Sequence, residues 1–146
     1  MKKILLSIII LSILVPFICF AKYIPDEIVD LTNEYRIENG LTKLKVDSTL
    51  NLVAGVVANY LVITAQFSHN GFGLTPWYWL NLFGYKYIWA GQNLARGFID
   101  TESNVKAWID SETHRANILS KNFNKIGIGM VKDKNGIIYV VQYFTN

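Results

Sequence analysis

The chain has 146 residues, of which 51% are hydrophobic, 14% aromatic and 17% charged. This length suits one domain and is too short for two ordinary ones, and the scarcity of charge with many aromatic residues excludes intrinsic disorder. The formal net charge is +3. It falls to +1 without residues 1–21, which hold two lysines and no acidic residue. We therefore expect no nucleic-acid partner.

Residues 1–21 have the layout of a secretory signal peptide. After a positive start, residues 4–15 form an apolar run broken by two serines, and residues 19–21 place small side chains before a cleavage point. We expect a protein that is secreted or held in the cell envelope, with one domain at residues 22–146. The alternative is an uncleaved signal that anchors the chain in a membrane; the short apolar run and Pro16 favour cleavage.

The single cysteine, Cys19, lies inside this predicted signal. A mature chain without it forms no disulfide, has no cysteine nucleophile and holds no thiolate-bound zinc. The stability of the exported domain must then come from its hydrophobic core.

Two helices are predicted at the start of the mature chain. Pro25 suits a first helical turn, an apolar face follows at helical spacing, and Asn39-Gly40 ends the helix. Asp47 is the predicted N-cap of a second helix that reaches to about Phe67. This second segment is apolar enough to suggest a membrane span, but polar or small residues recur every four positions. That stripe favours a core helix nearly surrounded by protein.

Residues 67–89 contain nine aromatic residues, Trp77 and Trp79 among them. One interpretation is a core and pocket wall, where large aromatic side chains usually lie. The other is an exposed aromatic surface for lipid, glycan or a membrane interface. Nine aromatic residues exceed what a small core hides, so we expect part of this set to be exposed.

The C-terminal third predicts one helix followed by a β-hairpin. Residues 101–110 form the helix, with Val105 and Trp108 pointing inward. Isoleucine and glycine alternate over residues 126–131, Asn135-Gly136 indicates a type I′ turn, and a second strand follows. Helices first and a hairpin last indicate an α+β fold with an antiparallel sheet.

Two histidines, His69 and His114, are the candidate reactive groups, and Gly91-Gln92-Asn93-Leu94-Ala95 lies between them. Together with other short pieces they resemble the CAP superfamily (cysteine-rich secretory proteins, antigen 5 and pathogenesis-related 1 proteins; the SCP domain), in its short bacterial form without cysteines. The matching pieces are residues 31–36, 39–41, 67–69, 91–95, 107–108, 114–119, 126–129 and 141–144. They occur in the family's order over nearly the whole mature chain.

The resemblance implies a three-layer α-β-α sandwich with a central antiparallel sheet. It also implies a cleft in which two histidines and acidic residues converge, and which binds a divalent metal in some members. Family functions range over sterol or lipid binding, cell-wall and host interactions and, less securely, proteolysis. The fold alone does not decide among them.

Two departures from the family pattern bear on chemistry. Gln92 stands where members usually carry Glu, and Ser111, beside Glu112, stands where larger members place a second Glu. Glu102 or Glu112 would have to replace the missing carboxylates. Because an amide cannot act as a general base, both changes argue against acid-base catalysis.

We therefore expect an exported module that binds a small apolar ligand (sterol or fatty acid), a cell-wall component or a partner protein. The expected cleft comprises Gln92, Asn93, Glu102, Ser111 and Glu112, and Trp77 and Trp79 offer an apolar ligand surface. No cofactor is required, although His69 and His114 are candidates for weak zinc binding. A metal-dependent hydrolase in the same cleft and a purely structural domain remain the alternatives.

Overall fold

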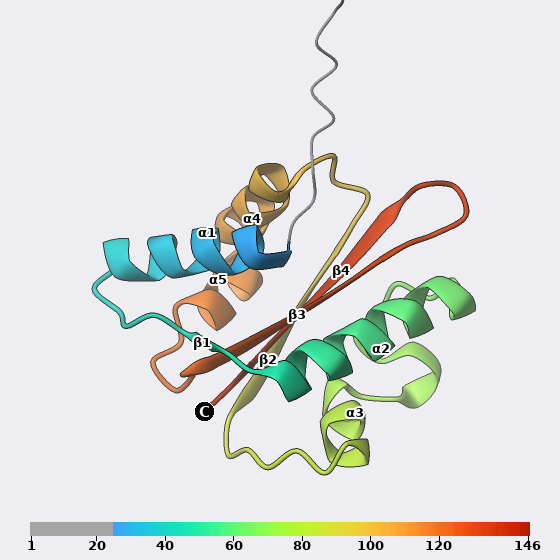
Figure 1. The fold of residues 1–146 in the computed structure, drawn as a ribbon, viewed down its shortest axis with the longest axis horizontal. Helices are drawn as coiled ribbons and strands as arrows, with labels where there is room; N and C mark the ends of the chain where they lie inside the picture. The colour runs from blue at the N-terminus through green and yellow to red at the C-terminus, as the bar shows by residue number, and fades with distance from the viewer. Residues whose placement is uncertain (1–24) are drawn as a thin grey trace, which may run out of the picture.

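A four-stranded sheet lies between two layers of helices in the computed structural model, which describes residues 25–146 (Figure 1). The strands are β1 (Lys45–Val46), β2 (Ala90–Arg96), β3 (Lys125–Lys132) and β4 (Ile138–Thr145), in the order β1-β3-β4-β2. Strands β2, β4 and β3 are antiparallel neighbours, whereas β1 pairs with β3 in parallel. The predicted α+β class and central antiparallel sheet are confirmed. The short parallel strand β1 was not predicted.

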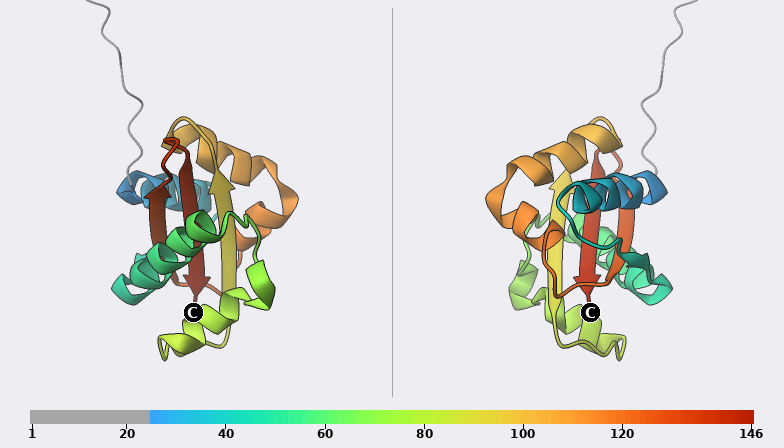
Figure 2. Two further views of the ribbon diagram at one scale, coloured as in Figure 1. Left: turned by 90° about the vertical axis from the view of Figure 1, so that its right-hand side faces the viewer. Right: turned by 90° about the vertical axis from the view of Figure 1, so that its left-hand side faces the viewer.

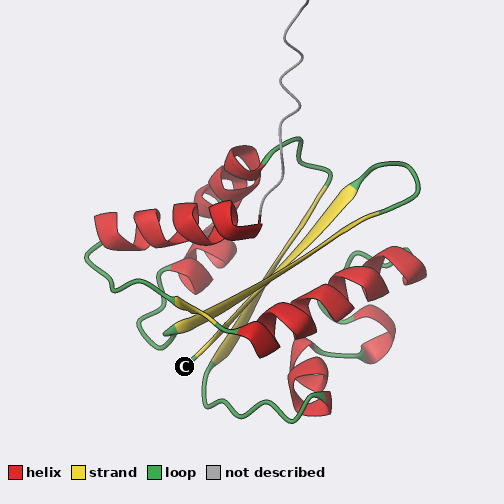
Figure 3. Ribbon diagram, viewed as in Figure 1, coloured by secondary structure: helices red, strands yellow, loops and turns green. Residues whose placement is uncertain are grey.

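The helices divide between the two faces of the sheet (Figure 3). One layer contains α1 (Pro25–Glu38), α4 (Thr101–Asp110) and α5 (Glu112–Ile118). The other contains α2 (Ser48–Thr64), the 3₁₀ turn Gly71–Gly73 and α3 (Pro76–Leu82). Each layer packs a separate apolar cluster on the sheet, so the three-layer sandwich follows from two cores. Val105 and Trp108 are buried as predicted.

Helix α2 lies unusually close to β3 because two glycines face it. A Cβ added to Gly127 would lie 2.3 Å from Cβ of Leu50, and one added to Gly129 would lie 2.1 Å from the carbonyl carbon of Ala54. No side chain fits in that space. The alternation of isoleucine and glycine in β3 therefore buries isoleucine on one face and leaves the other face for the helix backbone.

The prediction for α2 is correct at its start and wrong at its end and surroundings. The Asp47 carboxylate accepts hydrogen bonds from the amides of Thr49 and Leu50, as an N-cap does. The helix ends at Thr64, before the expected boundary, and its outer face is open to solvent, with Ile63 74% exposed. Among residues 25–146, no helix is long and apolar enough to cross a membrane.

The predicted β3-β4 hairpin is present, but its turn is not type I′. Gly136 has a φ of 84°, whereas Asn135 does not adopt the positive φ that a type I′ turn requires at both central residues. Instead the Asp133 side chain accepts hydrogen bonds from the amides of Asn135 and Ile137 and closes a longer loop. A local side-chain bond thus replaces the expected turn geometry.

Arg36 of α1 is fully buried and ties this helix to the segment after α5. Its guanidinium donates hydrogen bonds to the carbonyl oxygens of Thr42, Ile118, Ser120 and Phe123. Burial lowers the pKa of Arg36. Backbone carbonyl oxygens, rather than a carboxylate, satisfy the guanidinium group. Arg36 therefore holds the loop backbone in place through hydrogen bonds and not through an ion pair.

The predicted signal at residues 1–21, with Cys19, lies outside the described residues. Its cleavage and the start of the mature domain stay predictions.

Substituting a glycine of β3 tests the close approach of α2 to this strand. We expect Gly129→Ala to destabilise the fold by about 3 kcal/mol, because the added methyl group overlaps helix backbone. The matched control is Gly55→Ala on α2, where an added Cβ meets nothing within 4 Å. That change should stabilise the helix by up to about 1 kcal/mol. Urea denaturation measures both, and equal stability of Gly129→Ala and the wild type would contradict the packing.

Candidate functional site

The candidate site straddles β2, which is an edge strand of the sheet (Figure 2). Successive strand residues point to opposite faces, so Gln92 faces the layer of α2 and α3 and Asn93 faces the layer of α1 and α5. Gln92 is paired in register with Tyr143, and Asn93 with Gln142. The side-chain amides of these two neighbouring residues therefore lie on opposite faces of the sheet.

His69 lies in the segment between α2 and α3, with its Nδ1 atom 2.7 Å from Oε1 of Gln92. An amide oxygen accepts hydrogen bonds and cannot donate, so Nδ1 of His69 carries the proton in this contact. In the neutral ring the lone pair is then on Nε2. The bond to Gln92 therefore leaves Nε2 of His69 as a hydrogen-bond acceptor.

Tyr143 supports this orientation of the Gln92 amide. Its hydroxyl donates to the carbonyl oxygen of Pro76 at 3.0 Å, and the Gln92 side chain is also a hydrogen-bond partner of that hydroxyl. Because the hydroxyl hydrogen is committed to Pro76, the Gln92 NH₂ group donates to Tyr143 and its oxygen is left for His69. Burial raises the pKa of Tyr143, so this residue stays protonated and uncharged.

On the other face of the sheet, Asn93 is the centre of a buried amide network. Its oxygen accepts from Nδ2 of Asn117 at 2.8 Å, and its NH₂ group donates to Oε1 of Gln142 at 3.0 Å. Gln142 donates onward to the Thr32 hydroxyl at 3.0 Å. The same Asn93 NH₂ group also donates to the carbonyl oxygen of His114 at 3.2 Å. The network therefore holds α5, and with it His114, against the edge of the sheet.

His114 is half-buried on α5, and its Nδ1 lies 2.8 Å from the Ser111 hydroxyl oxygen. Burial, with the charge of His69 as a smaller contribution, lowers the pKa of His114. This ring is therefore neutral at pH 7. The charge of His69 thus acts on His114 although the two residues are forty-five positions apart in the sequence. That the two histidines form one site stays a prediction.

A cleft of about 380 Å³ opens beside Gln92. Its lining residues are His69, Asn70, Pro76, Trp77, Ala90, Gly91, Gln92 and Asn117. None of them carries a carboxylate, an ammonium or a guanidinium group. A Cβ at Gly91 would lie 2.9 Å from Oδ1 of Asn117, so glycine is required where Asn117 closes over the strand. The lining combines amide and imidazole groups with the half-exposed ring of Trp77.

The two glutamates that were expected to restore the missing carboxylates do not complete the histidine pair. Glu102 lines a different hollow, between α1 and α4, together with Glu34 and Tyr35, so its assignment to the cleft is wrong. Glu112 is exposed in the first turn of α5. Over residues 25–146, no three His, Cys, Asp or Glu side chains form a group that could hold a metal ion.

The two tryptophans proposed as an apolar ligand surface also separate. Trp77 lines the cleft, 38% exposed, whereas Trp79 is 9% exposed and packs against Tyr60 with ring centroids 4.9 Å apart. Trp79 therefore belongs to the core. Sequence reasoning missed Asn70, Pro76, Asn117 and Tyr143 as site residues. Asn117 lies within a piece of the family resemblance and could have been found from it.

Comparison with known proteins agrees with this geometry. The model of the CAP, cysteine-rich secretory protein family matches residues 29–144. The chain belongs to this family. It is 38% identical over 119 residues to the uncharacterized Bacillus subtilis protein YkwD, a match that covers 80% of this chain and 45% of YkwD. This CAP domain thus spans less than half of that relative's length.

Solved structures show the same fold. An extracellular SCP-domain protein from Bacillus anthracis has a TM-score of 0.77 at 28% identity, covering 84% of this chain and 40% of the other. An outer surface protein from Borrelia burgdorferi has a TM-score of 0.78 at 26% identity, covering 83% of this chain and 90% of the other. The predicted CAP/SCP fold is therefore confirmed.

The donor set of the cleft does not fit a closed metal site. Zinc normally takes four ligands, and the cleft offers the imidazole of His69 and the oxygen of Gln92, which is already bonded to His69. The second expected imidazole, His114, does not line the cleft. Any zinc would depend on His69 and His114 and on water for its other ligands. Such a site is open and weak.

We therefore expect weak zinc binding that requires both histidines and is lost in acid, because protonated imidazole cannot ligate. The lowered pKa of His114 keeps that ring able to ligate to a lower pH than an ordinary histidine. Gln92→Glu should strengthen binding, because it adds a carboxylate beside His69. Calorimetry on the wild type, His69→Ala, His114→Ala and Gln92→Glu measures these effects. Unchanged zinc affinity in both alanine variants would leave the histidines with a structural role.

Proposed function

We propose that this CAP domain is an exported, non-catalytic binding module whose cleft recognises an uncharged polar ligand, and that the ligand is a glycan of the cell wall. The observation that carries the proposal is the Gln92-His69 contact. It replaces the carboxylate of the family pattern with a neutral acceptor, and it leaves a cleft lined by no charged side chain.

The contact between Gln92 and His69 also argues against catalysis by a residue at position 92. A general base must accept a proton, and the Gln92 amide has no basic form near neutral pH. Ser111 and His114 are hydrogen-bonded to each other, but neither residue lines the cleft. The metal-dependent hydrolase alternative therefore lacks a carboxylate base and a complete ligand set in the part of the chain that is described.

The chemistry of the lining favours a glycan over a sterol or fatty acid. Gln92, Asn117 and His69 present polar groups suited to hydroxyl and amide substituents. Trp77 and Pro76 present apolar surfaces on which the CH face of a sugar ring stacks. A fatty-acid carboxylate would find no cation in this lining, and a sterol ring would offer no hydrogen-bond donor to Nε2 of His69.

Export rests on two observations. Residues 1–21 have the layout of a signal peptide, and two similar structures come from proteins described as extracellular or outer surface. A wall glycan is a ligand that such a location offers. A protein partner on the cell surface is the other candidate for the same cleft.

Binding to purified cell-wall sacculi tests the proposal. We expect residues 22–146 to co-sediment with sacculi, and Trp77→Ala to weaken this binding about tenfold through the loss of stacking. Trp89→Ala is the matched control, because Trp89 is also exposed but does not line the cleft. Equal binding by Trp77→Ala and the control would contradict the proposal, and release of soluble wall fragments would instead indicate a hydrolase.

A further inference from the structure

The segment that connects α3 to β2 exposes a set of large apolar side chains at one end of the molecule. Leu82 is 60% exposed, Ile88 79% and Trp89 54%, and Phe83 lies beside them at 36%. We call residues 82–89 the apical loop. It lies at the same end as the C-terminus, away from the loop between β2 and α4 (Figure 2). Such a concentration of exposed apolar area is uncommon on a soluble domain.

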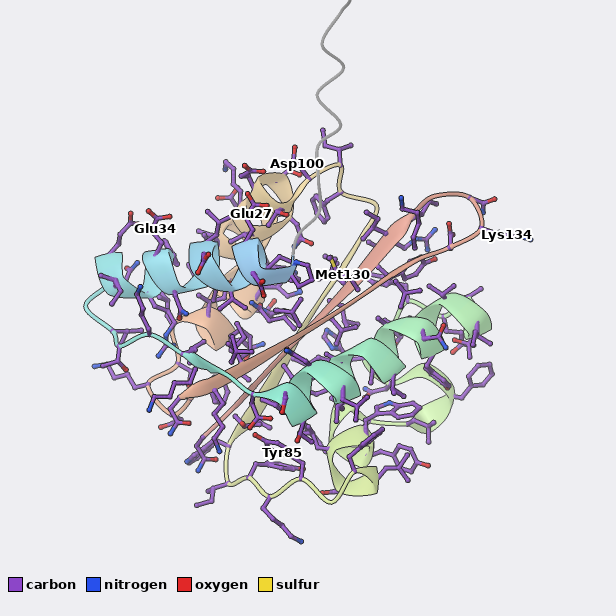
Figure 4. All side chains as sticks on the ribbon, in the orientation of Figure 1. Glu27, Glu34, Tyr85, Asp100, Met130 and Lys134 are labelled. Carbon is purple, nitrogen blue, oxygen red and sulfur yellow. The ribbon has the colours of Figure 1, made fainter. Side chains whose placement is uncertain are left out.

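The backbone of the apical loop is held firmly, so this exposure is a fixed feature. The Asn146 side chain accepts hydrogen bonds from the amides of Ile88 and Trp89, each at 2.8 Å. The Tyr85 hydroxyl donates to the Asp47 carboxylate at 2.9 Å. The Tyr87 ring packs near that of Trp77 on α3. Tyr85 (labelled in Figure 4) and Tyr87 thus anchor the loop, while the side chains of Leu82, Ile88 and Trp89 are exposed.

The charges around the loop are predominantly positive, with three lysines and one acidic side chain, Asp47. From residue 48 to residue 99 the chain contains no Asp or Glu. Lys86 is exposed in the loop itself, Nζ of Lys125 lies 5.9 Å from the centroid of the Tyr85 ring, and Lys45 is paired in register with Lys125. The nearby Asp47 is occupied as the N-cap of α2 and as the acceptor of Tyr85. Nine of the eleven carboxylates belong to α1, α4 and α5 or directly precede α4.

We propose that the apical loop docks this domain on an anionic lipid bilayer. Tryptophan and aliphatic side chains enter the interfacial region of the membrane, and the lysines contact anionic headgroups. The acidic residues of the layer of α1, α4 and α5 lie away from the apical loop. They are therefore not brought close to the anionic headgroups, which would repel them. Charge complementarity favours this occupant over a second copy of the chain, whose loop would bring like charges together. The inference is independent of the ligand bound in the cleft.

Vesicle co-sedimentation tests the docking surface. We expect residues 22–146 to bind vesicles of equal parts phosphatidylglycerol and phosphatidylcholine more tightly than vesicles of phosphatidylcholine alone. Ile88→Asp should lower partitioning roughly tenfold, because it puts a carboxylate at the membrane interface. Ile99→Asp is the matched control, since Ile99 is 76% exposed at the other end of the molecule. Lys86→Glu should reduce binding to the anionic vesicles and leave binding to neutral vesicles unchanged.

The proposal is overturned if the wild type stays in the supernatant, or if Ile88→Asp and Ile99→Asp bind vesicles equally. It is also overturned if ultracentrifugation shows a dimer that Ile88→Asp dissociates, because the loop is then a self-interface. Circular dichroism confirms that each variant is folded. Ile88→Asp should retain full binding to sacculi, so a failure of docking and a failure of the cleft proposal give different results.

Discussion

The buried side chain of Asn93 joins the sheet to the helical layer of α1 and α5. It accepts a hydrogen bond from Asn117 on α5 and donates one to Gln142 on β4, which reaches Thr32 on α1. A buried amide without its partners costs about 1–3 kcal/mol, so each of these residues must be in place when the layers close. The positions of β2 and α5, and therefore of the cleft between them, depend on this network.

The cleft is uncharged because of how β2 places its side chains on the two faces of the sheet. Asn93 faces the layer of α1 and α5, while its neighbour Gln92 faces the layer of α2 and α3 and meets His69 and Tyr143. The Gln92 amide is satisfied on both sides by uncharged groups of the protein, and burial keeps Tyr143 protonated. With a carboxylate at position 92 the same scaffold would hold a base or a metal ligand. With glutamine it presents fixed donors and acceptors, which suits recognition rather than reaction.

Short-range patterns were sufficient for much of the fold. The N-cap at Asp47, the end of α1 at Asn39-Gly40 and the hairpin all depend on neighbouring residues. The expectation that His69 and His114 lie in one cleft came from the family resemblance. What could not be predicted depends on distant contacts: Trp77 and Trp79 are two positions apart, yet one lines the cleft and the other is core. Likewise, Glu102 faces α1 because of how α4 packs, and the Asp133 side chain decides the turn.

The most direct test of the Gln92-His69 contact, on which this account of the cleft depends, is the tautomer of His69, measured by long-range ¹H-¹⁵N correlation NMR on the folded domain above pH 7. The bond to Gln92 Oε1 predicts a protonated Nδ1 and an unprotonated Nε2, and Gln92→Ala should abolish this preference. Ser111→Ala, which alters the partner of the other histidine, should leave the His69 signals in place. A His69 ring protonated at Nε2 alone would contradict the account, because Nδ1 could not then donate to the amide oxygen.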